Sequence, residues 1–284
     1  MLRLLAPQRA TLEELILDGN KLGGVLPPEI GAFAQLRLLN FFHMGLTGPP
    51  LTDAVRLLAP LASTLQVLAL DHNRLGGALL SDIAAFTQLT ELHLSEMRLE
   101  GPLPAELGAL ARLSVLYLND NGFTGRLPRE LGNLVNLTAL DVSENRLTGD
   151  LPQELGKLEN LTTLDLYRNG FTGPPLHETL RLLAPLASTL EVLGLNDNKL
   201  GGTIPPDVQA FSKLEVLGMW SMELEGTARL PFARVRMRAR VEIFGERQVS
   251  PTLVVLWGGW GAGAPLTRGG WSPDRRDPGG ARTA

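Results

Sequence analysis

Histidines with carboxylates close by are the residues of this chain best suited to chemistry. His43 and His72 are 29 residues apart, and His93 lies between Glu91 and Glu96. Imidazole and carboxylate groups together can hold a zinc ion, and histidine can also respond to mildly acidic pH. We nevertheless expect no metal site here, because side chains at such positions of an open surface are normally just solvated.

The sequence carries no catalytic pattern. It has no cysteine, which excludes disulfides, thiolate metal ligands and cysteine nucleophiles. The run Gly259-x-Gly261-x-Gly263 lacks the strand and helix that surround a dinucleotide fingerprint, and His177-Glu178 lacks the second histidine of a zinc protease. We therefore expect neither an enzyme nor a bound cofactor.

The histidines belong to a repeated sequence that must position them. The pattern Leu-x-x-Leu-x-Leu-x-x-Asn-x-Leu-x-Gly is clearest from Leu113 to Gly125. Its copies begin at Leu12, Leu36, Leu65, Leu89, Leu113, Leu137, Leu161, Leu190 and Leu214. Six of the spacings are 24 residues and two are 29. A period in this range indicates a leucine-rich-repeat solenoid. The sequence thus predicts an α/β fold with nine repeats in a right-handed coil and a concave parallel sheet over residues 1–226.

Each part of the repeat has a predicted place. In the copy that opens at Leu113, alternation along a strand points Leu116 inward and Tyr117 out of the concave sheet. Asn121 is expected to turn the chain and to satisfy backbone groups of the loop. The insertions at 52–64 and 177–189 predict short helices on the convex side, each ending near a proline. Methionine replaces the turn asparagine in three repeats, at Met44, Met97 and Met222.

The extended motif at residues 145–161, Asn-x-Leu-Thr-Gly-x-Leu-Pro-x-Glu-Leu-Gly-x-Leu-x-Asn-Leu, resembles the plant-specific class of leucine-rich repeats. That class occurs in ectodomains of receptor-like kinases, in receptor-like proteins and in polygalacturonase-inhibiting proteins. The resemblance covers about residues 12–225 and implies recognition of a macromolecule. The paired cysteines that cap secreted plant members are missing from this sequence. The 29-residue repeats and the methionine turns are more similar to an algal or protist variant than to a land-plant receptor.

We expect a partner to bind the concave face through exposed aromatic and ionisable side chains, because aromatic residues dominate interface energetics. The candidate binding residues are Phe42, His43, His72, His93, Tyr117, Asp141, Asp165, Tyr167 and Trp220. Tyr117 and Tyr167 are expected to share one column of the sheet, about 10 Å apart. The alternative is that these aromatics simply favour strands and have no ligand.

Charge divides the chain into two parts. Residues 1–226 hold 16 Lys and Arg against 26 Asp and Glu, whereas residues 227–284 hold 10 Arg against 4 acids. An acidic solenoid does not suit nucleic acid, whose binding depends on neutralising phosphates, and it favours a basic protein partner. The Arg-, Gly-, Pro- and Trp-rich residues 227–284 are predicted to be a second, poorly ordered region. Two alternatives remain: one or two strands within 230–257 that seal the open end, or an aberrant extension of the gene model.

The sequence gives weaker indications of compartment and assembly. No apolar stretch reaches the length of a membrane helix, and the nearest candidate, 249–266, contains glycines and prolines. Without a leader or cysteines the chain leans towards the cytoplasm, and towards the extracellular side or cell surface if it is a fragment. It begins inside a repeat, so we expect self-association through an uncapped N-terminal edge.

Three functions are consistent with these features. The first is a protein–protein interaction scaffold that binds its partner on the concave face. The second is a secreted or receptor-type recognition module, such as an inhibitor of a cell-wall enzyme or a receptor for a pattern, as the resemblance implies. The third is a fragment of a longer repeat protein that has no ligand of its own. Fold alone does not decide between them.

Overall fold

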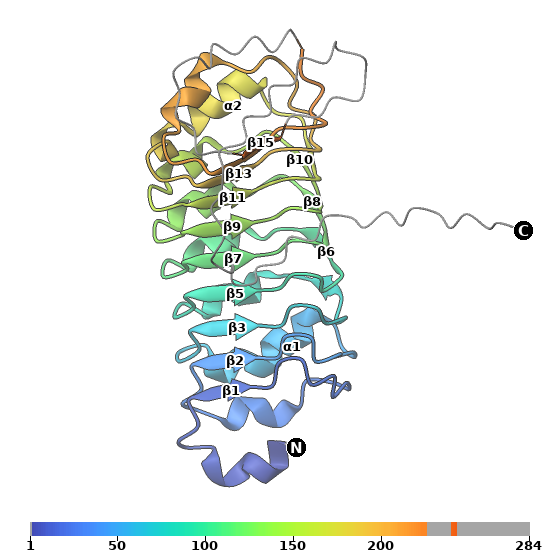
Figure 1. Ribbon diagram of the computed structural model, residues 1–284. Coiled ribbons are helices and arrows are strands. Elements are labelled where there is room, and N and C mark those ends of the chain that lie inside the picture. Colours follow the sequence, from blue (N-terminus) through green and yellow to red (C-terminus); the bar gives the residue numbers. More distant parts are fainter. Residues whose placement is uncertain (1, 226–239, 243–284) are drawn as a thin grey trace, which may run out of the picture. The chain divides into compact units, whose positions relative to one another are not determined.

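A parallel sheet of short strands runs the length of the repeats. The computed structural model describes residues 2–225 and 240–242. Within these residues the sheet has ten strands in the order β1-β2-β3-β5-β7-β9-β11-β13-β14-β15, stacked one above the next in Figure 1. Their bounds are β1 (Glu14–Ile16), β2 (Leu38–Asn40), β3 (Val67–Ala69), β5 (Glu91–His93), β7 (Val115–Tyr117), β9 (Ala139–Asp141), β11 (Thr163–Asp165), β13 (Val192–Gly194), β14 (Val216–Gly218) and β15 (Arg240–Glu242).

The strands pair in a register that keeps equivalent residues side by side. The central leucines align across the sheet, Leu116 with Leu140 and Leu140 with Leu164. All three are fully buried, which confirms the predicted inward face. Because side chains alternate along a strand, the residues on either side of each central leucine face outward. Equivalent residues of successive repeats therefore form continuous rows across the sheet.

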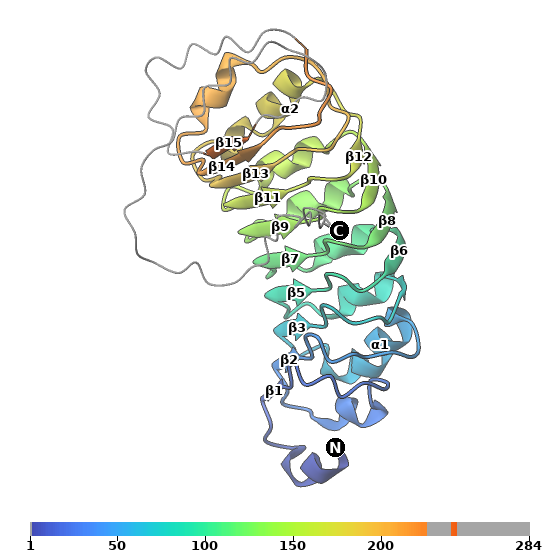
Figure 2. The same cartoon turned by 45° about the vertical axis from the view of Figure 1, so that its right-hand side comes forward.

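A second parallel sheet flanks the first, and the sequence analysis did not predict it. It has five strands in the order β12-β10-β8-β6-β4, and Figure 2 shows β6, β8, β10 and β12 along one side of the repeats. The bounds are β4 (Gly77–Ala78), β6 (Leu99–Pro102), β8 (Gly122–Gly125), β10 (Arg146–Gly149) and β12 (Gly170–Phe171). The residues that follow the turn asparagine or methionine form these strands. Gly125 at the end of β8 has φ +79°, a conformation that favours glycine.

Short helices complete each repeat. The 3-10 helices are η1 (Leu2–Gln8), η2 (Pro28–Ala32), η3 (Ala59–Leu61), η4 (Ser81–Ala85), η5 (Ala105–Ala109), η6 (Arg129–Asn133), η7 (Gln153–Lys157), η8 (Ala184–Leu186) and η9 (Pro206–Ala210). The two long repeats instead contain α1 (Leu51–Leu58) and α2 (Leu176–Leu182), each followed by a 3-10 turn with a proline. This confirms the helices predicted from the two insertions.

One continuous core fills the space enclosed by the strands and the helices. It contains leucines from every leucine repeat, together with buried phenylalanines such as Phe86, Phe123 and Phe171. No single repeat encloses its own leucines, because each is covered by the repeats on either side. Stability therefore depends on contacts between neighbouring repeats, as in other solenoids.

The turn asparagines join consecutive repeats. The Nδ2 group of Asn121 donates to the carbonyls of Leu118 in its own repeat (3.0 Å) and Leu94 in the preceding one (2.8 Å), and Oδ1 accepts from the N–H of Leu99 (2.9 Å). The same double bridge is formed by Asn73, Asn145, Asn169 and Asn198. The predicted role of the asparagine is confirmed, and it extends across two repeats.

The methionine turn at Met97 is tolerated because neighbouring asparagines bond the carbonyls that an amide there would reach. Met97 is fully buried and has no amide. The carbonyl of Leu70 in the preceding repeat is bonded by Asn73, and that of Leu94 in its own repeat is bonded by Asn121. Arg98 after Met97 takes a left-handed φ of +61°, as Lys21 does after Asn20 (+49°).

The sheet continues beyond the ninth leucine repeat. β15 pairs with β14 in parallel, with Arg240 opposite Val216, which keeps the 24-residue spacing although the leucine pattern has ended. One strand in the segment 230–257 is thus present, as the first alternative for this region anticipated. The rest of residues 227–284 lies outside the described residues, and its predicted poor order stays a prediction.

The asparagine bridges predict unequal effects of one substitution at two positions. In Asn145→Met, the carbonyls of Leu118 and Val142 each keep an amide partner, from Asn121 and Asn169. In Asn73→Met, which lies between two methionine turns, the carbonyls of Phe41 and Leu70 lose their amide. Since an unsatisfied buried polar group costs about 1–3 kcal/mol, we expect Asn73→Met to lower the free energy of unfolding by roughly 2–4 kcal/mol more than Asn145→Met. Urea unfolding of both variants measures this, and equal losses would contradict the bridging role.

Candidate functional site

The outward face of the ten-stranded sheet carries three rows of side chains. The strand-end row comprises the last residue of each strand, such as Tyr117, and the post-strand row the residue two positions later. The turn row comprises the residue just before each turn asparagine or methionine, such as Asp120. Together we call these rows the sheet face. Turn-row residues from His43 to Ser221 have φ values of +49° to +55°, so their side chains leave a left-handed backbone.

The structure divides the three histidines between two places. His43 and His72 are neighbours in the turn row, with ring centroids 6.0 Å apart, and the ring of Phe42 meets that of His72 edge-on at 4.7 Å. His93 lies in the strand-end row, where its ring meets the edge of Tyr117 at 5.1 Å. His43 and His72, 29 residues apart in the sequence, are thus direct neighbours on the surface.

Two of these imidazoles lie within hydrogen-bond distance of a carboxylate. His72 Nδ1 lies 2.8 Å from Glu96 Oε2, and His93 Nε2 lies 3.1 Å from Glu91 Oε2. Within residues 2–225 and 240–242, no group of three or more His, Asp or Glu side chains is arranged to hold a metal ion. His72 and His93 therefore belong to two separate imidazole–carboxylate pairs on the sheet face.

Two aspartates stand side by side at the centre of the strand-end row. Asp141 and Asp165 are paired positions on β9 and β11. Asp141 Oδ1 accepts from the N–H of Ser143 (2.9 Å) and from its hydroxyl (2.6 Å), and Asp165 Oδ1 accepts from the N–H of Tyr167 (3.3 Å). Burial raises the pKa of Asp141, and burial together with the neighbouring Asp141 raises the pKa of Asp165 to about 7. Near neutral pH the pair therefore carries less than two full negative charges.

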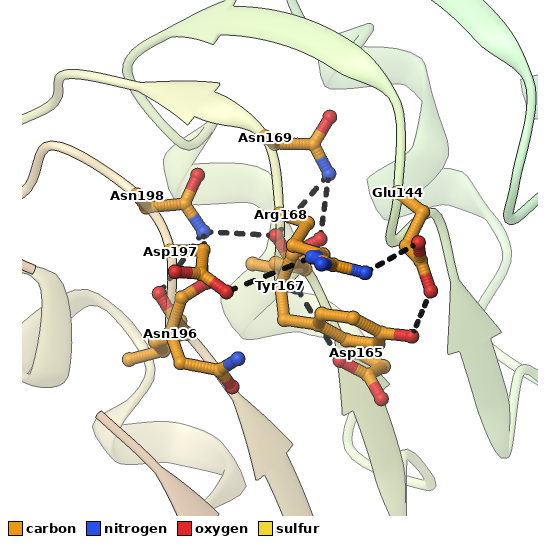
Figure 3. A network of polar contacts seen from close by, with 10 residues as sticks. Glu144, Asp165, Tyr167, Arg168, Asn169, Asn196, Asp197 and Asn198 are labelled. Carbon is orange, nitrogen blue, oxygen red and sulfur yellow. Dashed lines mark hydrogen bonds and ion pairs between the residues drawn. The ribbon is translucent and has the colours of Figure 1, made fainter. Parts of the chain in front are cut away.

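A network of charged groups continues from this pair along the post-strand and turn rows (Figure 3). The Tyr167 hydroxyl donates to Glu144 Oε1 at 2.5 Å, and Arg168 Nη1 lies 3.0 Å from Glu144 Oε2. On the other side, Arg168 Nε lies 3.8 Å from Asp197 Oδ2. Burial and the hydrogen bond to Glu144 raise the pKa of the Tyr167 hydroxyl above its usual range, so Tyr167 stays a hydrogen-bond donor. Arg168 bridges two acids and neutralises only part of their charge.

The two tyrosines do not share a row, contrary to expectation. Tyr117 ends β7, whereas Tyr167 follows the end of β11 by two residues and belongs to the post-strand row. Both are half-buried. Trp220 is also half-buried in the post-strand row, at the ninth repeat, and Phe42 is 38% exposed at the second. The predicted aromatic residues thus lie on one face but spread over most of its length.

Glycines make room for two of the polar side chains, a feature that the sequence analysis missed. Gly194 occupies the strand-end row beside Asp165, and a Cβ atom there would collide with Asp165 Oδ1. Gly218 gives the same space to the amide of Asn196. The sequence did contain an indication of this space, because β13 and β14 both read Val-Leu-Gly and end on glycine, unlike the other strands of the nine repeats. Glu144 and Arg168 were also not singled out, although they occupy the same turn row as the histidines.

Sequence comparison with family models finds the leucine-rich repeat in this chain. The Leucine Rich Repeat model matches residues 11–33, 112–134, 136–158, 160–182 and 189–211. The chain is therefore a leucine-rich-repeat solenoid, and its repeats match the plant type. The three repeats that turn on methionine fall outside the matches, and so does the repeat that turns on Asn73. A search of curated proteins found no match.

Solved structures of plant receptors share the fold. The ectodomain of the Arabidopsis thaliana receptor kinase GASSHO1/SCHENGEN3, in complex with CASPARIAN STRIP INTEGRITY FACTOR 2, is 33% identical over 76% of this chain, with a TM-score of 0.67. The Arabidopsis receptor kinase HAESA, in complex with the peptide hormone IDA and the co-receptor SERK1, is 25% identical over 82%, with a TM-score of 0.69. The repeat protein spans only 25% and 38% of these two chains.

Similarity to other proteins of this fold extends beyond receptors. A plant ice-binding protein is 24% identical over 82% of this chain, which spans 65% of that protein, with a TM-score of 0.57. This similarity shows the fold alone. Among the described residues of the leucine-rich-repeat protein, no helix has the length and apolar character needed to cross a bilayer. The weakly apolar stretch at 249–266 lies outside the described residues.

The raised pKa of Asp165 predicts a pH-dependent effect of Asp165→Asn. The folded chain keeps a proton on Asp165 up to about pH 7, whereas the unfolded chain releases it near pH 4. Ionised Asp165 therefore lowers the free energy of unfolding as pH rises from about 4 to about 7, and the loss persists above pH 7. We expect Asp165→Asn to gain stability relative to wild type over this range, by roughly 2–4 kcal/mol.

Thermal or urea unfolding at pH values on both sides of this window measures the gain. Asp150→Asn, at an exposed position on the flank, is the matched control and should show no such rise. A stability difference between Asp165→Asn and wild type that stays constant with pH would contradict the assignment.

Proposed function

We propose that the sheet face binds a protein or peptide partner through a segment that carries basic side chains. The observation that carries this proposal is the adjacent pair Asp141 and Asp165, flanked by Tyr117 in the strand-end row and by Tyr167 in the post-strand row. Neither aspartate forms an ion pair with a basic residue of the described chain. Arg168, the nearest guanidinium in the turn row, is engaged by Glu144 and Asp197.

Charge over the whole sheet face supports a basic partner. Across the three rows of the first nine repeats, eight residues are Asp or Glu, one is Arg and none is Lys. The acids are Asp18, Asp71, Glu96, Asp120, Asp141, Glu144, Asp165 and Asp197. An acidic surface attracts a basic partner and speeds its encounter. A Lys or Arg placed over Tyr117 would gain both a carboxylate and an aromatic ring as contacts.

Related proteins support binding of a peptide or protein. The receptor kinases GASSHO1/SCHENGEN3 and HAESA were solved in complex with CASPARIAN STRIP INTEGRITY FACTOR 2 and with the peptide hormone IDA, respectively. A rigid row of strands also presents its side chains with little loss of entropy on binding, which favours affinity. The receptor-type alternative uses the same surface and differs in its partner, so identification of a captured partner separates it from a general scaffold. The fragment alternative predicts no specific partner.

A second proposal concerns the first repeat, which we expect to mediate self-association. Leu4 is 81% exposed, Ile16 on β1 is 52% exposed and Leu22 is 55% exposed. Exposed apolar side chains beside an edge strand favour association between copies. Light scattering of Ile16→Lys/Leu22→Lys should then show less concentration dependence than wild type. A wild-type chain that is monomeric at all concentrations would contradict this proposal.

The main proposal predicts that Tyr117→Ala/Tyr167→Ala weakens partner binding by about 1–3 kcal/mol, as expected for aromatic anchors. The partner is first captured with the full chain and identified by mass spectrometry, and its affinity is then measured by calorimetry. Gln153→Ala/Lys157→Ala on η7, where both side chains are exposed, serves as the control and should bind normally.

Asp141→Asn should slow association and flatten its dependence on salt, because it removes a charge that steers the partner. If the double-tyrosine variant binds normally while deletion of residues 227–284 abolishes binding, recognition belongs to the C-terminal region and the proposal for the sheet face is wrong.

A further inference from the structure

A hollow opens beside the turn row in repeats two to five, away from the central aspartates. It has a volume of about 280 Å³, and its lining includes His43, His72, Arg74 and Arg98. These four side chains come from three repeats and can all carry positive charge. The hollow therefore concentrates basic groups on a chain whose sheet face is otherwise acidic.

The two arginines occupy equivalent positions in consecutive repeats. Arg74 follows the turn residue Asn73, and Arg98 follows the turn residue Met97, 24 residues later. Past the turn, Gly77 of β4 pairs with Leu99 of β6, so the backbone of Arg98 lies next to Gly76, and both arginines line the same hollow. Both side chains are exposed, and within residues 2–225 neither guanidinium makes an ion pair or a hydrogen bond. Two neighbouring guanidiniums without an anionic partner repel each other unless an anion joins them.

The backbones that carry the two arginines differ. Arg98 has a φ of +61°, whereas the equivalent Arg74 does not have a positive φ. This left-handed backbone is not confined to methionine turns, because Lys21 after Asn20 has a φ of +49°.

The histidines form the wall of the hollow nearest the sheet. Glu96 engages His72 at Nδ1 (2.8 Å), which leaves Nε2 as the nitrogen available to a ligand. The ring of His43 lies beside it, with centroids 6.0 Å apart. Glu96 and Asp120 also line the hollow, so its charge is balanced when both imidazoles are neutral and is +2 when both are protonated.

We propose that this hollow is a binding site for a tetrahedral oxyanion of the sulfate or phosphate class. Guanidinium groups donate pairs of hydrogen bonds to such oxygens, and the imidazoles that line the same hollow supply further donors. A tetrahedral anion has enough oxygens to engage both arginines and a histidine at once, whereas a carboxylate has only two. The site is separate from the aspartate pair and does not depend on the function proposed for the sheet face.

The test uses inorganic sulfate as the probe and NMR of the His43 and His72 rings of the full chain as the readout. It is run near pH 6, where histidines are commonly protonated and sulfate remains a dianion. Sulfate should shift both rings in a saturable manner, whereas sodium chloride at matched ionic strength should not. Identical shifts with chloride would mean simple screening of charge and would overturn the proposal.

Variants distinguish the hollow from general electrostatics. Arg74→Gln and Arg98→Gln should each weaken sulfate binding by about tenfold, and Asp120→Asn should strengthen it several-fold by removing a repelling charge. Arg146→Gln is the matched control. Arg146 also directly follows a turn asparagine, two repeats after Arg98, and it does not line the hollow; Gly122 and Gly170 hold this position in the repeats on either side. Equal losses for Arg146→Gln and Arg74→Gln would contradict the site.

A final comparison identifies the source of the anion. A tripeptide with a central phosphoserine is titrated beside inorganic phosphate under the same conditions. Tighter binding of the peptide assigns the hollow to an anion carried by a protein, and equal binding assigns it to the free ion. Failure of both, together with failure of sulfate, overturns the proposal and leaves the binding of a basic partner on the aspartate pair untouched.

Discussion

The amide of each turn asparagine is the interaction on which the repeat array depends. It bonds carbonyls in its own repeat and in the preceding one, as Asn121 does with Leu118 and Leu94. A buried carbonyl without a partner is costly, so each turn holds its neighbour at a fixed distance and register. The array tolerates methionine at Met97 because the repeats on either side, with Asn73 and Asn121, keep their amides. Each amide reaches only its own repeat and the preceding one. Turns that lack an amide must therefore be separated by asparagine turns.

Because the register between repeats is fixed, residues one repeat period apart in the sequence become neighbours on the surface. Asp141 and Asp165 are 24 residues apart and yet stand side by side, and Tyr167 reaches Glu144 across the same spacing. None of these contacts exists within a single repeat. The functional surface is therefore a property of neighbouring repeats, and duplication or loss of one repeat would change the partners of every side chain at its border.

The sheet face keeps carboxylates in surroundings that disfavour their charge. Burial raises the pKa of both Asp141 and Asp165, and each carboxylate repels the other. Such groups lower stability when ionised, and a cation from a partner would relieve this cost. Gly194 makes the arrangement possible, because any larger residue would occupy the space of the Asp165 carboxylate. Arg74 and Arg98 lie just beyond the turn row and line a separate hollow, so basic groups gather beside the acidic sheet face.

The sequence by itself determined the repeat period, the inward leucines and the role of the turn asparagine, because each of these follows from a local pattern repeated many times. It also indicated the acidic face and the helices in the two long repeats. Tertiary structure alone decided the flanking five-stranded sheet, since strands of two to four residues carry too little pattern to be recognised without their neighbours. The separation of His93 from His43 and His72, and of Tyr117 from Tyr167, can instead be read from the sequence, because His93 and Tyr117 lie four residues after the leucine that opens their repeat and the other three lie six or seven residues after theirs. The raised pKa of Asp165 and the exposed pair Arg74 and Arg98 arise from burial and proximity between repeats, and these are properties of packing that no single repeat contains.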